Sequence, residues 1–376
     1  MHGLAYRRQL FREYISSDTM PNMWSKNLIT LCSLVPLLVT PTLACSRVTY
    51  NTGPQDGNRT IVGRSMDWLT PTNSSIFAFP AGLQRNGSAG GNSLNWTSKY
   101  GSVITTAYDL STCDGINDQG LVANLLYLAD GDYGPRNSSV PAMSLAIWPQ
   151  YFLDLYSTVA EAADDLFNQN GQPKFQVRTK DLIPGVPSLM HVSLSDATGD
   201  NLILEWLNGK LVVHQGTEYN VMTNEPNFDQ QLAINAYWST ISNYSLPGTD
   251  RPADRFARLS HYVSVAPGAT DLVSGLATTA GMIRAVSVPM EPININTPNI
   301  TPTLWRTYAD TKELVYYYES ATDGKFFWVD MTKLDLSKKG QTMKLSLVGL
   351  NWTDRVGDMT SNFVKSSPFS FMPANN

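Results

Sequence analysis

The chain contains few cysteines and few histidines for its length. Its 376 residues include three cysteines and four histidines. Two of the cysteines, Cys45 and Cys113, lie beyond residue 44, which is too few for a fold held together by several disulfides. The three histidines in the same part of the chain are far apart and lack the short spacing of a zinc site. We therefore expect no metal site and no other cofactor.

The chain also lacks an excess of positive charge and a long apolar run. It has 27 Lys and Arg residues against 32 Asp and Glu residues, a formal net charge of −5. Such a balance does not predict a surface for a nucleic-acid backbone. The apolar run from Leu28 to Val39 is shorter than the roughly 20 residues that a transmembrane helix needs. We expect neither a nucleic-acid partner nor a stable membrane span.

The amino-terminal region has the three parts of a signal peptide. A short positively charged segment ends at Lys26, and the apolar run from Leu28 to Val39 has the length of the hydrophobic region of a signal peptide. Thr42-Leu43-Ala44 then matches a small-residue cleavage site. We expect export to the periplasm or out of the cell. Residues 1–44 are the predicted leader, removed on export, and residues 45–376 are predicted to form a single domain.

Cys45 follows the predicted cleavage site directly, and two interpretations of it are open. Cleavage would leave a thiol beside its own α-amine, which is a nucleophile with a built-in base. Leu43-Ala44-Cys45 is also the end of a bacterial lipobox, in which the cysteine is lipidated and serves as an anchor. Thr42 occupies a position where a lipobox prefers an aliphatic residue.

The rest of the sequence is rich in strand patterns early and late, with helical spacing between them. Turn formers from Gly53 to Asn58 predict a hairpin between strands at Ser46 to Tyr50 and Thr60 to Trp68. Further strands are expected at 102–108, 121–127, 190–194, 202–206, 210–214, 303–309, 313–319 and 325–330. Helical spacing covers 142–155, 159–167, 254–263 and 269–284. The predicted class is α+β, with helices packed over sheets.

Several motifs in order give the chain a resemblance to a known family. They are Cys45-Ser46-Arg47, Gly63-Arg64-Ser65-Met66-Asp67-Trp68, Asp114-Gly115-Ile116-Asn117-Asp118-Gln119-Gly120-Leu121, His191 to Gly199, and Thr223-Asn224-Glu225-Pro226-Asn227-Phe228. Together they resemble the choloylglycine hydrolase family, which includes bile salt hydrolases and penicillin V acylases. The resemblance implies an N-terminal-nucleophile (Ntn) hydrolase fold, a four-layer αββα sandwich with two mainly antiparallel sheets. It also implies an amidase that cleaves linear carbon–nitrogen bonds other than peptide bonds.

The resemblance assigns roles around the nucleophile. Cys45 would attack the amide carbonyl, with its α-amine as the base. Asp67 matches the carboxylate that bonds the amine, and Arg64 matches an arginine beside the thiol, which in a half-buried site would favour the thiolate.

Three further residues are assigned in the same way. Asn224 matches the side-chain donor of an oxyanion hole, and Tyr127 supplies a backbone N–H as the second donor. Arg255 matches a distal arginine that stabilises charge near the thiol, although Arg251 and Arg258 are close to it in the sequence.

The resemblance implies a small-molecule N-acyl amide as the substrate. Tyr127 stands where penicillin acylases tend to carry tyrosine and bile salt hydrolases asparagine, and Trp68 is placed to line an acyl pocket or to pack beneath the sheet. Both residues favour a penicillin V acylase-like or N-acyl homoserine lactone acylase-like enzyme. The alternatives are a bile salt hydrolase, a self-cleaving ceramidase-type enzyme and a non-catalytic, lipid-anchored acyl-binding envelope protein. A homo-oligomer is possible in the family, but the segment that helps to build tetramers is short here.

Overall fold

The computed structural model describes residues 45–181, 187–290, 301–348 and 356–375. All of them lie within one compact unit, Val39–Asn376. The predicted leader and its cleavage site fall outside the described residues, apart from Cys45 itself. No helix in the described ranges is both long enough and apolar enough to cross a membrane.

The first sheet has seven strands and carries Cys45 at the start of β1. Its order is β14-β1-β2-β15-β16-β17-β19, antiparallel except for the parallel pair β17 and β19. The strands are β1 (Cys45–Asn51), β2 (Thr60–Asp67), β14 (Val221–Met222), β15 (Thr303–Asp310), β16 (Val315–Ser320), β17 (Phe326–Asp330) and β19 (Gly357–Asp358). The predicted hairpin of β1 and β2 is confirmed, with Cys45 paired opposite Met66.

The second sheet has nine antiparallel strands in the order β13-β12-β11-β8-β7-β6-β3-β18-β20. They are β3 (Ser75–Phe79), β6 (Ser102–Ala107), β7 (Ser111–Asn117), β8 (Val122–Tyr127), β11 (Met190–Ser195), β12 (Asn201–Leu207), β13 (Lys210–Gln215), β18 (Met343–Ser346) and β20 (Val364–Lys365). Two small sheets pair β4 (Gln84–Asn86) with β5 (Asn95–Thr97) and β9 (Ala142–Ser144) with β10 (Gln176–Arg178).

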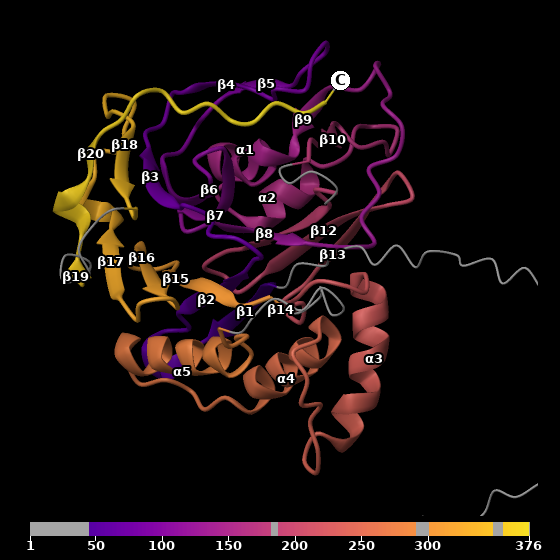
Figure 1. Ribbon diagram of the computed structural model, residues 1–376, viewed down its shortest axis with the longest axis vertical. Helices are drawn as coiled ribbons and strands as arrows, with labels where there is room; N and C mark the ends of the chain where they lie inside the picture. The colour runs from indigo at the N-terminus through magenta and orange to yellow at the C-terminus, as the bar shows by residue number, and fades with distance from the viewer. Residues whose placement is uncertain (1–44, 182–186, 291–300, 349–355, 376) are drawn as a thin grey trace, which may run out of the picture. The chain divides into compact units, whose positions relative to one another are not determined.

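Helices cover the outer face of each large sheet. Helices α1 (Trp148–Leu155) and α2 (Val159–Asp164) pack on the nine-stranded sheet, and α4 (Pro252–Val265) and α5 (Leu272–Ala285) pack on the seven-stranded sheet. Helix α3 (Phe228–Ile241) packs beside α4. The order helix, sheet, sheet, helix is visible from top to bottom in Figure 1. The predicted α+β class and the four-layer αββα sandwich are confirmed.

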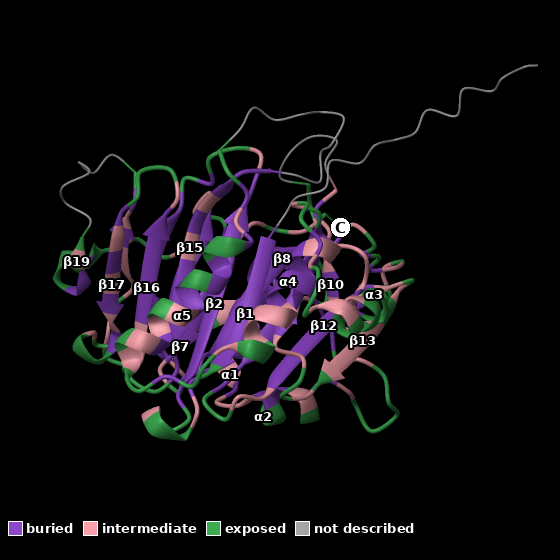
Figure 2. Ribbon diagram, turned by 90° about the horizontal axis from the view of Figure 1, so that it is seen from below, coloured by how far each residue is buried: buried purple, intermediate pink, exposed green. Residues whose placement is uncertain are grey.

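The central strands are buried on both faces because each sheet lies between a helical layer and the other sheet. Every residue of β2 is buried, and Figure 2 shows β1, β2 and β16 as buried ribbons beyond the partly exposed helix α5. Gly63 in β2 allows the close approach of that helix. A Cβ there would lie 2.8 Å from Thr279 Cγ2 and 2.9 Å from Ile283 Cγ1, both on α5.

One predicted helix is partly wrong, and several elements were not predicted. The helical spacing at 142–155 holds only for α1, because Ala142 to Ser144 form strand β9 in parallel with β10. That pairing joins segments more than thirty residues apart, which local periodicity does not report. Strands β3 and β7 and helix α3 were also missed. The other predicted strands and helices are found, with bounds shifted by a few residues.

Candidate active site

Cys45 lies deep between the two sheets, with its thiol on the face of β1 that looks toward β8. The residue is 2% exposed. Its Sγ lies 3.7 Å from Arg64 Nη2 and 3.9 Å from Met66 Sδ, and both of these residues belong to the neighbouring strand β2. The hairpin places them there, since Cys45 pairs with Met66 and residues two apart on a strand share a face.

Arg64 is fully buried rather than half-buried as expected from the sequence. Its Nη2 donates to the carbonyl of Leu125 in β8 at 3.1 Å, and its guanidinium lies 4.6 Å from the ring centre of Trp305. Burial would lower the pKa of Arg64, but the acidic groups of Cys45 and of the buried Asp114 together raise it above the ordinary value. Asp114 in turn accepts hydrogen bonds from the Tyr316 hydroxyl and from Asn124.

The surroundings keep the Cys45 thiol protonated. Burial raises its pKa above the ordinary value for cysteine, and the nearby charge of Arg64 lowers it by less than burial raises it. The expectation that Arg64 favours the thiolate is therefore correct in direction, but burial has the larger effect. If this thiol is to act as a nucleophile, it therefore requires a base that can take its proton.

The amide side chain of Asn224 connects the main chain of Cys45 to two other groups. Its Oδ1 accepts hydrogen bonds from Cys45 N at 2.6 Å and from Arg255 Nη2 at 2.8 Å. Its Nδ2 donates to the carbonyl of Tyr127 at 2.8 Å. Two donors at one end and a carbonyl at the other fix the orientation of the amide. The second Nδ2 proton has no acceptor in the described part of the chain.

The backbone of Tyr127 faces Asn224 and not the adjacent strand β11. Tyr127 pairs with Met190, whose N–H and C=O both bond the Tyr133 hydroxyl instead. In an antiparallel ladder the N–H and C=O of one residue point to the same side. Because the Tyr127 carbonyl accepts from Asn224, the Tyr127 N–H points toward the same region. The two predicted oxyanion donors are therefore brought together.

Of the three neighbouring arginines, Arg255 is the one that reaches Cys45. It extends from α4, and its Nη1 donates to the carbonyl of Cys45 at 2.6 Å and to the Ser46 hydroxyl. Arg258 instead bonds the carbonyls of Pro247 and Thr249. Arg251 is exposed at the start of the helix.

Asp67 ends β2 on the face opposite to the thiol. Its Oδ1 accepts from Thr303 Oγ1 at 2.6 Å, and its Oδ2 lies 3.8 Å from Arg255 Nη1 without a hydrogen bond from the described residues. Burial raises the pKa of Asp67 to about 6, against the lowering effect of Arg255. Cys45 N donates to Asn224 and not to Asp67, so the predicted bond between Asp67 and the amine is not formed in the uncut chain.

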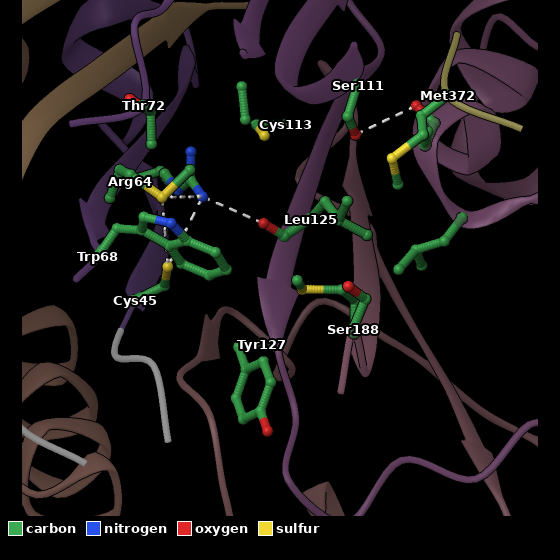
Figure 3. Close-up of a pocket in the computed structure, with 15 residues that line it drawn as sticks. Cys45, Arg64, Trp68, Thr72, Ser111, Cys113, Leu125, Tyr127, Ser188 and Met372 are labelled. Carbon is green, nitrogen blue, oxygen red and sulfur yellow. Dashed lines mark hydrogen bonds between the residues drawn. The ribbon is translucent and has the colours of Figure 1, made fainter. Parts of the chain in front are cut away.

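A cavity begins at the Cys45 thiol and is lined mostly by apolar side chains. Trp68 and Tyr127 line it, as does Met372 on the side away from Cys45 (Figure 3). The cavity has a volume of about 40 Å³, room for a few water molecules at roughly 10–15 Å³ each. Cys113 also lines it, and burial raises the pKa of this thiol to about 12, so it stays an inert apolar group.

Comparison with known proteins places this geometry in a family. A sequence model described as "Linear amide C-N hydrolases, choloylglycine hydrolase family" matches residues 45–344. The chain belongs to the choloylglycine hydrolase family. It is an amidase that acts on linear carbon–nitrogen bonds other than peptide bonds, as the resemblance predicted.

Relatives of this family member include penicillin V acylases. The chain is 41% identical over 369 residues to a penicillin V acylase from Pectobacterium atrosepticum, covering 91% of this chain and 96% of the relative. A penicillin V acylase structure from Agrobacterium tumefaciens matches with a TM-score of 0.79 and 42% identity, over 87% of this chain and 99% of that one. A conjugated bile acid hydrolase variant from Clostridium perfringens shares the fold, with a TM-score of 0.65 and 19% identity over 82% of this chain and all of that one.

We expect the activity of this amidase to fall as the pH drops through about 6. Asp67 is ionised above its raised pKa, and its negative charge then offsets that of Arg255 beside Cys45. Protonation below about pH 6 removes this compensation. The kcat/KM profile of the wild type should therefore show a second acid limb near pH 6, below the one that an α-amine base causes at about 7.7–8.0, and Asp67→Asn should lower the plateau and remove the limb near pH 6.

The control for this profile is Asp229→Asn, which changes a carboxylate that is 70% exposed on α3. This variant should keep the profile of the wild type. An Asp67→Asn enzyme that retained the limb at pH 6 would show that another group causes it.

Sequence reasoning missed a buried pair that supports the segment carrying Asn224. His191 lies with Nδ1 3.0 Å from Glu205 Oε1 and Nε2 2.8 Å from the carbonyl of Thr223. Each ring nitrogen therefore faces an oxygen that can accept a hydrogen bond, one on a side chain and one on the main chain. Glu205 also accepts from the backbone N–H of Phe228, the first residue of α3. The pair thus holds both ends of residues 223–228 in place.

Loss of this pair should destabilise the protein strongly. His191→Ala would remove the side-chain partner of the buried Glu205 and the hydrogen bond at the Thr223 carbonyl, and each buried polar group left without its partner costs about 1–3 kcal/mol. We expect urea unfolding to show that the free energy of unfolding falls by an amount of that order. His214→Ala is the matched control, because the partner of His214 is the exposed Asp229 and such pairs contribute about 1 kcal/mol or less. Equal losses in the two variants would contradict the structural role of His191.

Proposed function

We propose that this family member is exported, is cut before Cys45, and uses the new amino-terminal cysteine to hydrolyse N-acyl amides with an apolar acyl group. The observation that carries the proposal is the position of the thiol. The thiol lines an apolar cavity, and the backbone nitrogen of the same residue donates to Asn224, which also bonds the Tyr127 carbonyl.

Cleavage supplies the base that the buried thiol lacks. Before cleavage, Cys45 N belongs to a peptide bond and cannot take a proton. After cleavage it is an amine with a pKa of about 7.7–8.0. Asn224 Oδ1 already accepts a hydrogen bond from this nitrogen. That bond orients the other hydrogens and the lone pair of the amine. The amine takes the thiol proton as Sγ attacks the substrate carbonyl, and it returns this proton to the nitrogen of the departing amine.

The negative charge formed on the carbonyl oxygen is placed between two donors. These donors are the second Nδ2 proton of Asn224 and the backbone N–H of Tyr127. Each donor of this kind stabilises the transition state by about 2.7–4 kcal/mol. Collapse of the tetrahedral intermediate breaks the carbon–nitrogen bond and leaves a thioester on Cys45. Water, deprotonated by the amine, then attacks the thioester and releases the carboxylic acid and the thiol.

The lining of the cavity favours aryl-acyl or straight-chain acyl groups, as in penicillin V and N-acyl homoserine lactones. Trp68 presents its ring to the cavity while its Nε1 donates to the Tyr108 hydroxyl at 2.8 Å. The two penicillin V acylases that share 41% and 42% identity with this chain support the same substrate class. The bile acid hydrolase, at 19% identity, supports only the fold.

A lipid-anchored binding protein fits the site poorly. A diacylglyceryl group on Cys45 would start from a residue that is 2% exposed and whose sulfur faces an internal cavity. Such a group would fill the cavity before it could reach a bilayer. The burial of Cys45 therefore favours the nucleophile over the anchor.

The proposal is tested by intact mass and amino-terminal sequence of the exported protein together with amine release from penicillin V, N-dodecanoyl homoserine lactone and glycocholate. We expect a free Cys45 terminus and turnover of at least one of the first two substrates. Ala44→Glu, which blocks cleavage, should give an inactive protein. A lipid adduct on Cys45, or turnover of glycocholate alone, would contradict the proposal.

A further inference from the structure

The last ten described residues cross the nine-stranded sheet and its helices as an extended segment, Ser366 to Asn375, called here the terminal strap. It follows β20 and contains no helix or strand. In Figure 1 it is the yellow trace that leaves β18 and β20 and ends beside β9. The family model ends at residue 344, so the strap lies beyond the matched region.

The strap is held firmly although it lacks regular structure. Phe369 packs on Phe77 and Phe79, with ring centres 4.8 and 5.6 Å apart. The guanidinium of Arg85 lies over Phe79 at 4.6 Å and over Phe371 at 5.5 Å. Beyond these aromatic residues, the backbone N–H groups of residues 374 and 375 donate to the carbonyls of residues 88 and 179. The strap is therefore fixed on both sides of residue 372.

Met372 is bonded directly to two segments that form the cavity wall. Its N–H donates to the carbonyl of Leu110 at 2.9 Å, and its carbonyl accepts from Ser144 Oγ at 2.7 Å. Leu110 and Ser144 each precede residues that line the cavity, Ser111 in the first case and Leu145 in the second. The strap thus joins two parts of the wall and places the Met372 side chain between them.

The Met372 side chain closes the cavity on the side away from the nucleophile. It lines the same cavity as Cys45, and Figure 3 shows it across the cavity from that residue. Unlike the buried Met66 and Met190, it is only partly buried, so it separates the cavity from solvent. An acyl chain bound with its carbonyl at Cys45 and extending along the apolar lining reaches this side chain.

We propose that Met372 sets the length of the acyl group that the enzyme accepts. This inference rests on the proposed function, because it assumes that the acyl group of an N-acyl amide fills the cavity. Methionine is flexible and fills irregular gaps, so its side chain has to move farther aside as the acyl group becomes longer. The specificity-determining residue thus comes from the carboxyl terminus, more than 300 residues after the nucleophile.

The test is a series of N-acyl homoserine lactones from N-butanoyl to N-dodecanoyl, with phenoxyacetyl included, assayed by amine release on the exported full-length enzyme. One methylene in an apolar pocket changes kcat/KM by about 10–200-fold. We therefore expect Met372→Ala to move the optimum to a longer chain and to raise the ratio of long-chain to short-chain kcat/KM by about tenfold or more. Met372→Trp should move the optimum to a shorter chain.

Met343→Ala is the matched control, because Met343 is a partly buried methionine on β18 that does not line the cavity. It should keep the chain-length profile of the wild type. An active enzyme whose profile stays the same in both Met372 variants would overturn the inference, as would an equal shift in Met343→Ala. A wild type that cleaves penicillin V but no member of the series would overturn the inference alone, and one that cleaves neither would overturn the proposed function as well.

Discussion

Replacing Cys45 by serine is expected to abolish amide hydrolysis while the fold is retained. Loss of a nucleophile lowers kcat by at least about 10⁴-fold. The surroundings of the thiol explain why serine cannot substitute, since Sγ lies against Met66 Sδ and the guanidinium of Arg64. A hydroxyl at this position is far less acidic than a thiol, and its attack would depend entirely on proton transfer to the amine. The measurement is single-turnover release of amine, with circular dichroism to confirm folding.

Cys113→Ala is the matched control for the Cys45 variant. Cys113 is the other free thiol in the described chain, and it lines the same cavity. Because its pKa is raised to about 12, it is protonated and takes no part in attack at neutral pH. The Cys113→Ala enzyme should still form a thioester, and any difference from the wild type should be confined to KM. Turnover by Cys45→Ser at the rate of the wild type would refute the proposed mechanism.

Removing the amide of Asn224 is expected to produce the second largest fall in kcat. Asn224→Ala should lower kcat by ~10²–10³, the usual effect of deleting one oxyanion donor. This variant also removes the acceptor that Cys45 N and Arg255 share, so it does not separate the two functions of the side chain.

Asn224→Asp separates the two functions. The carboxylate keeps the acceptor for Cys45 N and Arg255 but removes the Nδ2 donor and places negative charge near the developing oxyanion. If the donor matters, this variant should lose as much kcat as Asn224→Ala. A rate close to that of the wild type for Asn224→Asp would show that Asn224 only orients the amine, and would remove it from the oxyanion hole.

The sequence predicted well those parts of the fold that depend on short-range pattern. The hairpin from Cys45 to Asp67 has turn formers between two strands, so its pairing follows from local chemistry. Strand β9 was mistaken for helix because its parallel pairing with β10 is not encoded in its three residues. Strand β3 pairs with β18, which lies far along the chain, so a distant neighbour decides its structure. Strand β7 pairs with its chain neighbours β6 and β8, but it contains Asp114, Gly115 and Asn117, residue types that are depleted in strands.

The members of the site were easier to predict than the contacts between them. Motif resemblance gave Cys45, Asn224 and Arg255, and the structure brings them within hydrogen-bonding distance. The resemblance did not show that the Asn224 amide bonds both the Cys45 nitrogen and the Tyr127 carbonyl. That arrangement depends on how β1, β8 and the segment before α3 pack together. His191 opens one of the resembling motifs, but neither its supporting contacts nor the position of Met372 at the cavity could be predicted, since both depend on what these residues touch in the folded chain.

The cavity wall is unusually rich in sulfur, and this exposes the enzyme to oxidants. Five of the fifteen lining residues are methionine or cysteine: Cys45, Met66, Cys113, Met190 and Met372. Peroxide converts methionine to a polar sulfoxide, and accessible side chains react first. Met372, only partly buried, would become polar before the inner residues, so an oxidised enzyme would lose affinity for apolar acyl groups while its nucleophile was still intact. Methionine sulfoxide reductases reverse this lesion, so damage at that end of the cavity is repairable, whereas over-oxidation of Cys45 to a sulfonic acid is permanent.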